Sequence, residues 1–139
     1  MFNFKDRGDR NICLAPEYTA VIQQLAKTTF KDEKDIMLFY VQECFRGEKP
    51  QRGRYRQFTQ LGVEILNPTK DHTNTLISLA KSLVNLTGID ITIDNNVTRG
   101  LDYYKDGKGF EIRTSDLQIV GGGEYDGGIG FAIGIDRLI

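Results

Sequence analysis

The chain has 139 residues, of which 40% are hydrophobic and 27% are charged, and its formal net charge is −1. This length suits one domain that buries roughly two thirds of its unfolded surface, and the composition is ordinary for a soluble globular protein. A chain with a net charge near zero does not attract nucleic acid through its overall electrostatic field, so any such binding needs a local basic patch.

Cysteine and histidine usage argues against a structural metal. Cys13 and Cys44 form no CxxC pattern, and His72 is the single histidine, so we expect no metal site and reduced thiols. No apolar run reaches membrane-spanning length, and the N-terminus does not read as a signal peptide. We therefore expect a cytoplasmic protein without a membrane partner.

The first third of the chain predicts a short strand and a helix. Ile12 to Ala15 reads as a strand, and the segment TAVIQQLAK after Pro16 has helical spacing. Glu17 lies at the start of this helix, where an acid stabilises the positive N-terminus. A purely structural role for Glu17 is therefore as well supported as a role in a site.

The stretch from Tyr40 to Leu66 joins two strand-like runs through the polar loop GEKPQRG. Five cations lie within eleven residues here, against the single carboxylate of Glu48: Arg46, Lys49, Arg52, Arg54 and Arg56. Guanidinium groups give planar, charge-assisted hydrogen bonds to phosphate or carboxylate oxygens. Alternation along the return strand puts Phe58, Gln60 and Glu64 on one face. The pattern predicts an antiparallel pair that cradles a polar ligand, with a solvated charged hairpin as the alternative.

The middle of the chain predicts a helix followed by a strand. Asp71 is placed to cap a helix from His72 to Thr87, and Gly88 is placed to end it. His72 falls on the polar side of the first turn, so we interpret it as a surface residue. Ile89 to Ile93 alternates isoleucine with polar residues, which is typical of a half-buried strand.

The last third predicts further strands. After a turn at Asn95-Asn96, the segment RGLDYY at residues 99–104 offers a cation, a close backbone approach and two phenolic hydroxyls. An aromatic strand with a lone arginine is its structural alternative. Asp106 to Gly109 predicts a tight hairpin, and the strand Leu117 to Val120 opens into GGGEYDGG, whose glycines permit positive φ or close approach to a ligand.

Several of these segments resemble the histidyl-tRNA synthetases, a family of class II aminoacyl-tRNA synthetases. FRGEKPQRGRYRQFTQLGVE resembles their motif 2, RGLDYY their signature peptide, and GFAIGIDRLI motif 3. LAPEYT and GGGEYD resemble the family's LRPEGT and GGGRYD, from which they depart at Ala15, Tyr18 and Glu124. The resemblance runs from about residue 5 to the end of the chain.

The resemblance implies an α+β fold of the class II aminoacyl-tRNA synthetase catalytic-core type. We expect an antiparallel β-sheet of about six strands flanked by helices, which we place on one face, in a single domain over residues 1–139. It also implies a truncated core, with no motif 1 before Phe2, no insertion domain before RGLDYY and no anticodon-binding domain after Arg137.

Site residues follow from the resemblance at matching positions. The residues implied to bind ATP are Arg46, Glu48, Arg54, Phe58 and Arg137. The residues implied to bind histidine are Glu17, Thr19, Gln60, Glu64, Arg99, Tyr103 and Tyr104. Arg46 and Arg99 are the implied catalytic residues. Mg²⁺ is expected with ATP, and no protein ligands are assigned to it.

The expected function is ATP-dependent activation of an amino acid, histidine, to an aminoacyl-adenylate, which makes the chain a histidine–tRNA ligase-like enzyme. One alternative is a non-catalytic histidine- and ATP-binding module that resembles the synthetase-like regulatory subunit of ATP phosphoribosyltransferase. Another is a fragment of a larger synthetase. Without an anticodon-binding domain, tRNA is the weaker expectation for a partner, and homo-oligomerisation stays open.

Overall fold

The computed structural model describes residues 1–97, 104–115 and 117–139. The strands are β1 (Asn3–Lys5), β2 (Asn11–Cys13), β3 (Ile36–Phe45), β4 (Gln57–Leu66), β5 (Thr92–Val97), β6 (Tyr104–Arg113), β7 (Gln118–Tyr125) and β8 (Gly128–Gly134). The helices are α1 (Thr19–Lys27), α2 (Thr73–Asn85) and the short 3₁₀ helix η1 (Ile135–Arg137).

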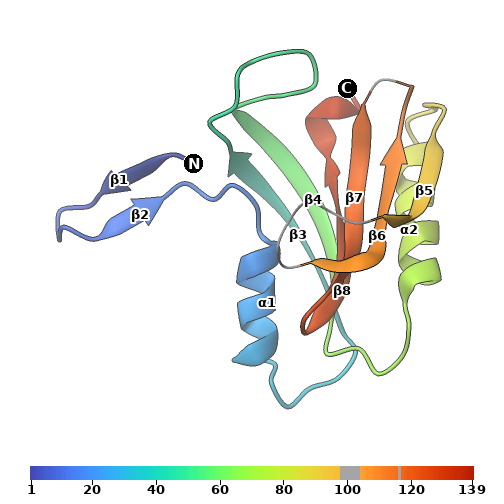
Figure 1. Cartoon of the computed structure of the whole chain (residues 1–139), viewed down its shortest axis with the longest axis horizontal. Helices are drawn as coiled ribbons and strands as arrows, with labels where there is room; N and C mark the ends of the chain where they lie inside the picture. The colour runs from blue at the N-terminus through green and yellow to red at the C-terminus, as the bar shows by residue number, and fades with distance from the viewer. Residues whose placement is uncertain (98–103, 116) are drawn as a thin grey trace.

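Six antiparallel strands form the central sheet in the order β3-β4-β8-β7-β6-β5 (Figure 1). This confirms the predicted sheet and its fold class. β1 and β2 form a separate hairpin that extends away from the sheet beyond the start of α1 (Figure 1). Within the described ranges, no helix is both long enough and apolar enough to cross a membrane.

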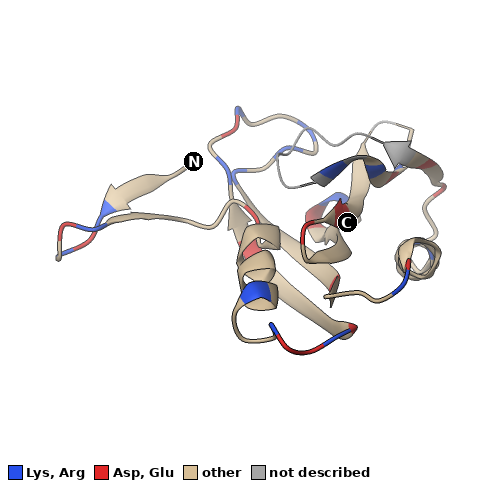
Figure 2. Cartoon of the chain, turned by 60° about the horizontal axis from the view of Figure 1, so that its bottom comes forward, with Lys and Arg blue, Asp and Glu red and all other residues tan. Residues whose placement is uncertain are grey.

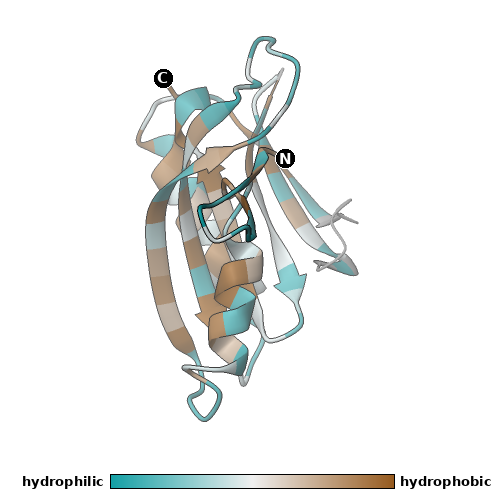
Figure 3. Ribbon diagram, turned by 90° about the vertical axis from the view of Figure 1, so that its left-hand side faces the viewer, coloured by the Kyte–Doolittle hydropathy of each residue, from teal (hydrophilic) through white to brown (hydrophobic). Residues whose placement is uncertain are grey.

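The two helices cover opposite faces of the sheet, so their expected placement on one face is wrong. On β4, Val63 and Ile65 pack in a core cluster that includes α2, whereas the next residue, Leu66, packs in a cluster with α1. Successive side chains of a strand point to opposite faces, so the apolar run at the end of β4 requires a cover on both sides. Bands of alternating hydropathy along the strands are visible in Figure 3.

The α1 face of the sheet is lined by small residues on β8. Gly130 pairs with Glu64 of β4, and a Cβ atom at Gly130 would lie 1.7 Å from the Glu64 Oε2 atom. Phe131 and Ile133 alternate with these small residues and are buried on the α2 face. The glycine at position 130 is therefore required because a glutamate side chain occupies the space above it.

Two turns predicted near the C-terminal half are wrong. Asp106 to Gly109 lies inside β6, and Asn95-Asn96 lies inside β5. Each segment coincides with an irregular register, between Tyr104 and Gly109 and between Asp94 and Val97. Turn-forming residues are also the residues that accommodate a β-bulge, so the same sequence signal produced an irregular strand.

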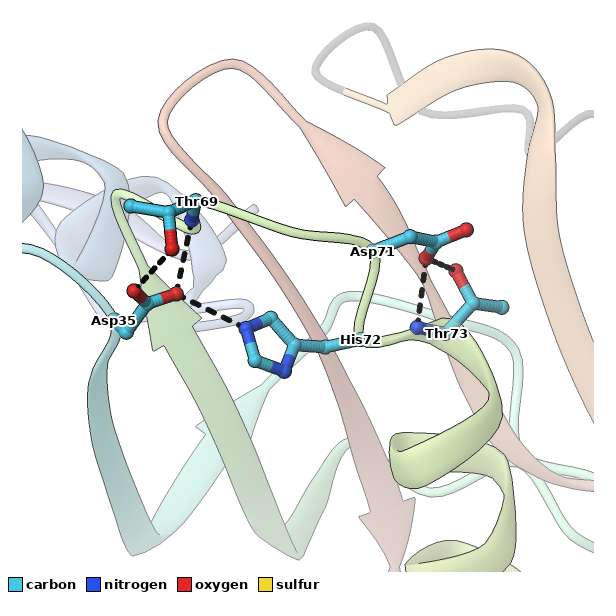
Figure 4. A network of polar contacts seen from close by, with 5 residues as sticks. All are labelled: Asp35, Thr69, Asp71, His72 and Thr73. Carbon is cyan, nitrogen blue, oxygen red and sulfur yellow. Dashed lines mark hydrogen bonds and ion pairs between the residues drawn. The ribbon is translucent and has the colours of Figure 1, made fainter.

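α2 begins one residue after the predicted His72 and ends at Asn85, two residues before the predicted Thr87. The Asp71 Oδ1 atom accepts hydrogen bonds from the Thr73 backbone N–H at 2.9 Å and from the Thr73 hydroxyl at 2.6 Å (Figure 4). Gly88 follows the helix with a φ of 74°, a conformation that favours glycine.

His72 is held between two elements and is not the surface residue that we expected. Its side chain is 12% exposed, and its Nε2 atom lies 3.0 Å from Oδ1 of Asp35, which precedes β3 (Figure 4). The Asp35 carboxylate also accepts hydrogen bonds from the Thr69 N–H at 2.9 Å and the Thr69 hydroxyl at 2.5 Å. This network fastens the start of β3 to the segment that leads into α2.

Candidate functional site

A pocket of about 440 Å³ opens on the α1 face, where the arginine-rich loop (residues 46–56, between β3 and β4) and η1 lie at the same end of the sheet (Figure 1). It is lined by Pro16, Glu17, Thr19, Arg46, Glu48, Gly53, Arg54, Tyr55, Phe58, Gln60, Gln118, Ile119, Gly121, Ala132, Gly134, Asp136 and Arg137. Cationic segments of the loop appear in blue in Figure 2, and the loop is hydrophilic in Figure 3. The structure thus brings together all five residues predicted to bind ATP.

Arg46 and Phe58 form one wall of the pocket. The Arg46 Nε–H donates to the carbonyl oxygen of Pro16 at 3.0 Å, and its guanidinium carbon lies 5.0 Å from the centre of the Phe58 ring. A guanidinium over an aromatic face is held by a cation–π interaction. The Arg46 guanidinium therefore lies over the Phe58 ring, and both side chains line the pocket.

Arg137 also lines the pocket and is held by two backbone carbonyl groups. Its Nε–H donates to the Gly53 oxygen at 2.7 Å, and its Nη1–H donates to the Gln118 oxygen at 2.5 Å. Burial lowers the pKa of Arg137, the charges of Arg46 and Arg54 lower it further, and the charge of Glu48 opposes them. Arg46, Arg54 and Arg137 line the pocket together with the carboxylates of Glu17, Glu48 and Asp136, so the pocket offers three guanidinium groups to an anion beside three acidic groups.

Asp136 lines the pocket and was missed in the sequence. Its Oδ2 atom accepts a hydrogen bond from the Thr59 backbone N–H at 2.6 Å, which ties η1 to β4. The β4–β8 pairing ends at Gln60 and Gly134. The Asp136 carboxylate therefore adds one more hydrogen bond to β4 beyond the end of β8. An acid next to Arg137 was visible in the sequence, but its partner is a backbone group far along the chain.

Glu17 and Thr19 line the pocket at the start of α1. The Glu17 Oε2 atom accepts hydrogen bonds from the backbone N–H groups of Thr19 at 2.5 Å and Ala20 at 3.3 Å. These bonds satisfy donors that the first turn of a helix leaves without partners. The structural interpretation of Glu17 is thus confirmed, and its role toward a ligand stays a prediction.

Gln60 follows Phe58 on the same face of β4. Its Oε1 atom accepts a hydrogen bond from the Cys44 thiol at 3.4 Å. Burial raises the pKa of Cys44 to about 11, so this thiol keeps its proton and acts as the donor. An amide oxygen has two lone pairs, so Gln60 retains one for a ligand.

Glu64 lies farther along this face of β4 and is 2% exposed. The Tyr125 hydroxyl donates a hydrogen bond to its Oε2 atom at 2.7 Å. Burial raises the pKa of Glu64 to about 8, the charge of Glu17 raises it as well, and the Tyr125 hydrogen bond lowers it. Tyr125 had no assigned role in the sequence, although its tyrosine in GGGEYD was a visible signal.

Three predicted site residues are not placed by the structure. Arg99 and Tyr103 lie outside the described residues, and Tyr104 begins β6 without a described side chain. Glu124, which replaces a family arginine, forms an ion pair with Lys105 at 2.7 Å. In the described part of the chain, no three His, Cys, Asp or Glu side chains gather as a metal site would require.

Comparison with known proteins identifies the family. The model of the tRNA synthetase class II core domain (G, H, P, S and T) matches residues 2–120. A histidine–tRNA ligase of Methanosarcina acetivorans is 32% identical over 136 residues, which are 91% of this chain and 31% of that protein. A histidine–tRNA ligase of Clostridioides difficile is 41% identical over 100 residues, which are 69% of this chain and 24% of that protein. The chain thus spans a third or less of these relatives.

Solved structures agree on the fold. The pyrrolysyl-tRNA synthetase of Desulfitobacterium hafniense matches 99% of this chain and 52% of its own, with a TM-score of 0.72 and 21% identity. An ATP phosphoribosyltransferase regulatory subunit/histidyl-tRNA synthetase from Bacillus halodurans matches 99% of this chain and 66% of its own, with a TM-score of 0.77 and 15% identity. On the family match and the shared fold together, this chain belongs to the class II tRNA synthetase core-domain family.

Proposed function

We propose that this domain activates histidine with ATP to form histidyl-adenylate and pyrophosphate. The observation that carries the proposal is one pocket wall rich in arginine, followed on the same face of β4 by a buried glutamate–tyrosine pair. The first part suits a nucleoside triphosphate, and the second suits a small polar side chain. Relatives named histidine–tRNA ligases support histidine as the amino acid.

The reaction joins two anions, and the arginines lower the free energy required. A carboxylate oxygen of histidine attacks the α-phosphorus, the bond to the bridging α–β oxygen breaks, and pyrophosphate leaves with that oxygen and its electron pair. Arg46 is proposed to hold the α-phosphate and the carboxylate, and Arg137 the terminal phosphates. Positioned cations stabilise charge in the transition state, and no general base is required because the carboxylate is already ionised.

The remaining nucleotide contacts are assigned to the rest of the arginine-rich wall. We assign Phe58 to the adenine ring, and Glu48 and Arg54 to the nucleotide. Mg²⁺ is proposed to enter with ATP, bound chiefly by phosphate oxygens and water, as this ion prefers. Glu48, Arg54 and Phe58 all line the same pocket.

The buried pair is assigned to the imidazole ring. Glu64 and Tyr125 together offer a carboxyl and a hydroxyl, both buried, and buried hydrogen-bonding groups discriminate strongly between substrates. Glu17, Thr19 and Gln60 are proposed to receive the α-amino group. The roles of Arg99, Tyr103 and Tyr104 stay predictions from the family resemblance, and so does transfer of the activated histidine to tRNA.

A non-catalytic histidine- and ATP-binding module is the second candidate. It is favoured by the Glu17 carboxylate, which is already bonded to the start of α1. It is also favoured by the Bacillus halodurans structural neighbour, whose description includes a regulatory subunit. Such a module requires the pocket but not the reaction.

The variant Arg46→Ala separates the two candidates. In an enzyme, it should lower histidine-dependent ATP–pyrophosphate exchange by about 100-fold or more, the usual effect of removing one transition-state donor, and change histidine affinity far less. Arg7→Ala is the charge-matched control because Arg7 is exposed and lies outside the pocket. A wild-type protein that binds histidine and ATP by calorimetry without any exchange would instead be the module.

A further inference from the structure

Gly53 is the one buried residue of the arginine-rich loop. Residues 49–52 and 54–56 on either side of it are exposed. Its φ of 76° lies in the region that favours glycine, which lets the backbone turn inward at this point. The loop is therefore fastened to the body of the protein at its tip as well as at its two ends.

Two groups meet Gly53. Arg137 donates its Nε–H to the Gly53 oxygen at 2.7 Å. The nearest carbon of the Leu117 side chain lies 2.5 Å from the position that a Cβ atom at Gly53 would occupy. The Leu117 backbone is held by three hydrogen bonds with Thr114. Its oxygen accepts from the Thr114 N–H at 2.8 Å and from the Thr114 hydroxyl at 3.4 Å, and its N–H donates to that hydroxyl at 3.1 Å. Leu117 therefore presents a rigid apolar support for the loop tip.

Arg137 is oriented by the same contacts. Its Nε and Nη1 atoms are bonded to Gly53 and Gln118, and its Nη2 atom has no acceptor among the described residues. The guanidinium group is planar, so two fixed nitrogens also fix the direction of the third. If Gly53 moves away, Arg137 loses one of its two supports, and Arg54, the next residue of the loop, leaves the pocket wall.

We propose that Leu117 and Gly53 are positioning residues of the phosphate site, through which anchoring of the arginine-rich loop is coupled to triphosphate binding. Neither residue is assigned a contact with substrate. Leu117 holds the loop tip, and the loop tip holds Arg137 in its phosphate-binding orientation. The inference rests on the proposed function, in which Arg137 receives the terminal phosphates.

The test compares Leu117→Ala with Leu83→Ala, a matched control on α2 whose leucine is also half-buried and packs on the same core cluster. Limited trypsin digestion reports loop anchoring through cleavage after Arg52, Arg54 and Arg56, with cleavage after Lys81 in α2 as the reference for general opening. Calorimetry with ATP and with AMP reports phosphate binding. Leu117→Met, which preserves volume, is the rescue variant.

Leu117→Ala should raise loop cleavage relative to Lys81 cleavage by about fivefold or more and weaken ATP binding by about tenfold, the worth of one charge-assisted hydrogen bond. Histidine affinity should change by less than about twofold, because histidine reaches neither Arg137 nor Arg54 in the proposed arrangement. AMP affinity should fall less than ATP affinity, because AMP has no terminal phosphates for Arg137 to hold and loses only the Arg54 contact. Leu83→Ala and Leu117→Met should behave as the wild type in both assays.

Equal loop cleavage in Leu117→Ala and Leu83→Ala would overturn the anchor. Faster loop cleavage with unchanged ATP affinity would overturn the coupling. If the wild type binds no ATP, the proposed function fails and the coupling with it, and the digestion still decides whether Leu117 anchors the loop.

Discussion

Glu64 is a buried carboxyl group whose pKa is raised to about 8, chiefly by burial. Its hydrogen bond with Tyr125 compensates part of the cost of placing a polar group inside the sheet. Such a group favours its neutral form, which is unusual for a glutamate at neutral pH. A strongly perturbed carboxyl group on the pocket face is more typical of a site than of a core.

The pH dependence of stability should depend on Glu64. Its pKa is higher in the folded protein than the usual value near 4.5, so the folded state binds more protons between about pH 4.5 and about pH 8. The stabilising contribution is complete below this window and is lost as pH rises through about 8. In Glu64→Gln, the free energy of unfolding should fall less between about pH 5 and about pH 9 than in the wild type.

Denaturant unfolding of both proteins across this range measures the difference. Gln keeps a carbonyl oxygen for the Tyr125 hydroxyl, so the variant should fold. Parallel pH profiles for the two proteins would contradict a buried, protonated Glu64.

β8 combines two tasks because its residues alternate between small and large. Phe131 and Ile133 fill the α2 face, whereas on the α1 face Gly130 makes room for the Glu64 side chain and Gly134 lines the pocket. The strand therefore contributes to the core on one side and to the floor of the site on the other.

Gly130→Ala should destabilise the protein by about 2–4 kcal/mol, because the new methyl group would overlap the Glu64 carboxyl and the Val63 carbonyl oxygen. Gly134→Ala is the matched control on the same strand, where the nearest atom lies 3.7 Å from the new Cβ. Its stability should stay within about 0.5 kcal/mol of the wild type. Thermal unfolding of the two variants checks this, and an equal loss in both would rule out the overlap at Gly130.

The network of Asp35, Thr69 and His72, which fastens the start of β3 to the segment that leads into α2, should lose its stabilising contribution in acid. Hydrogen bonds from Thr69 and the interaction with His72 lower the pKa of Asp35 to about 2 (Figure 4). The folded pKa is below the usual value, so this stabilisation is present above about pH 4 and is lost as pH falls through about 2. Asp35→Asn tolerates the φ of 51° at this position and removes the charge.

Asp35→Asn should therefore lower stability at neutral pH, and the difference from the wild type should shrink as the pH approaches 2. Urea unfolding at about pH 7 and about pH 3 measures both values. A constant difference across this range would show that the carboxylate charge is not what fastens the connection.

Periodic elements were predictable, and features that depend on distant partners were not. α1, α2 and the β3–β4 pair follow directly from hydrophobic spacing, and the arginines of the loop predicted where the pocket lies. Gly107, with its φ of 68°, was interpreted as part of a hairpin, whereas it lies within β6, in the irregular register between Tyr104 and Gly109 of the β6–β7 pairing. The carboxylate of Asp136 and the side chain of Leu117 act on residues that only the fold brings near.

The whole molecule divides its functions between the two faces of one sheet. The α2 face holds the larger apolar core, and the α1 face holds the pocket and the Glu64–Tyr125 pair. At the β3 edge, the α2 face is open, with Met37, Phe39 and Val41 exposed by 61%, 73% and 56%. The pocket lies within the described part of this chain, which spans 31% of the length of one histidine–tRNA ligase relative.

The central claim is tested most directly by ATP–pyrophosphate exchange on the purified protein with each of the twenty amino acids in turn. The proposed function predicts exchange with histidine alone, abolished in Arg46→Ala and retained in Arg7→Ala. Exchange with a different amino acid would contradict the assignment of Glu64 and Tyr125 to the imidazole ring. No exchange with any amino acid, in a protein that still binds histidine and ATP, would contradict catalysis itself.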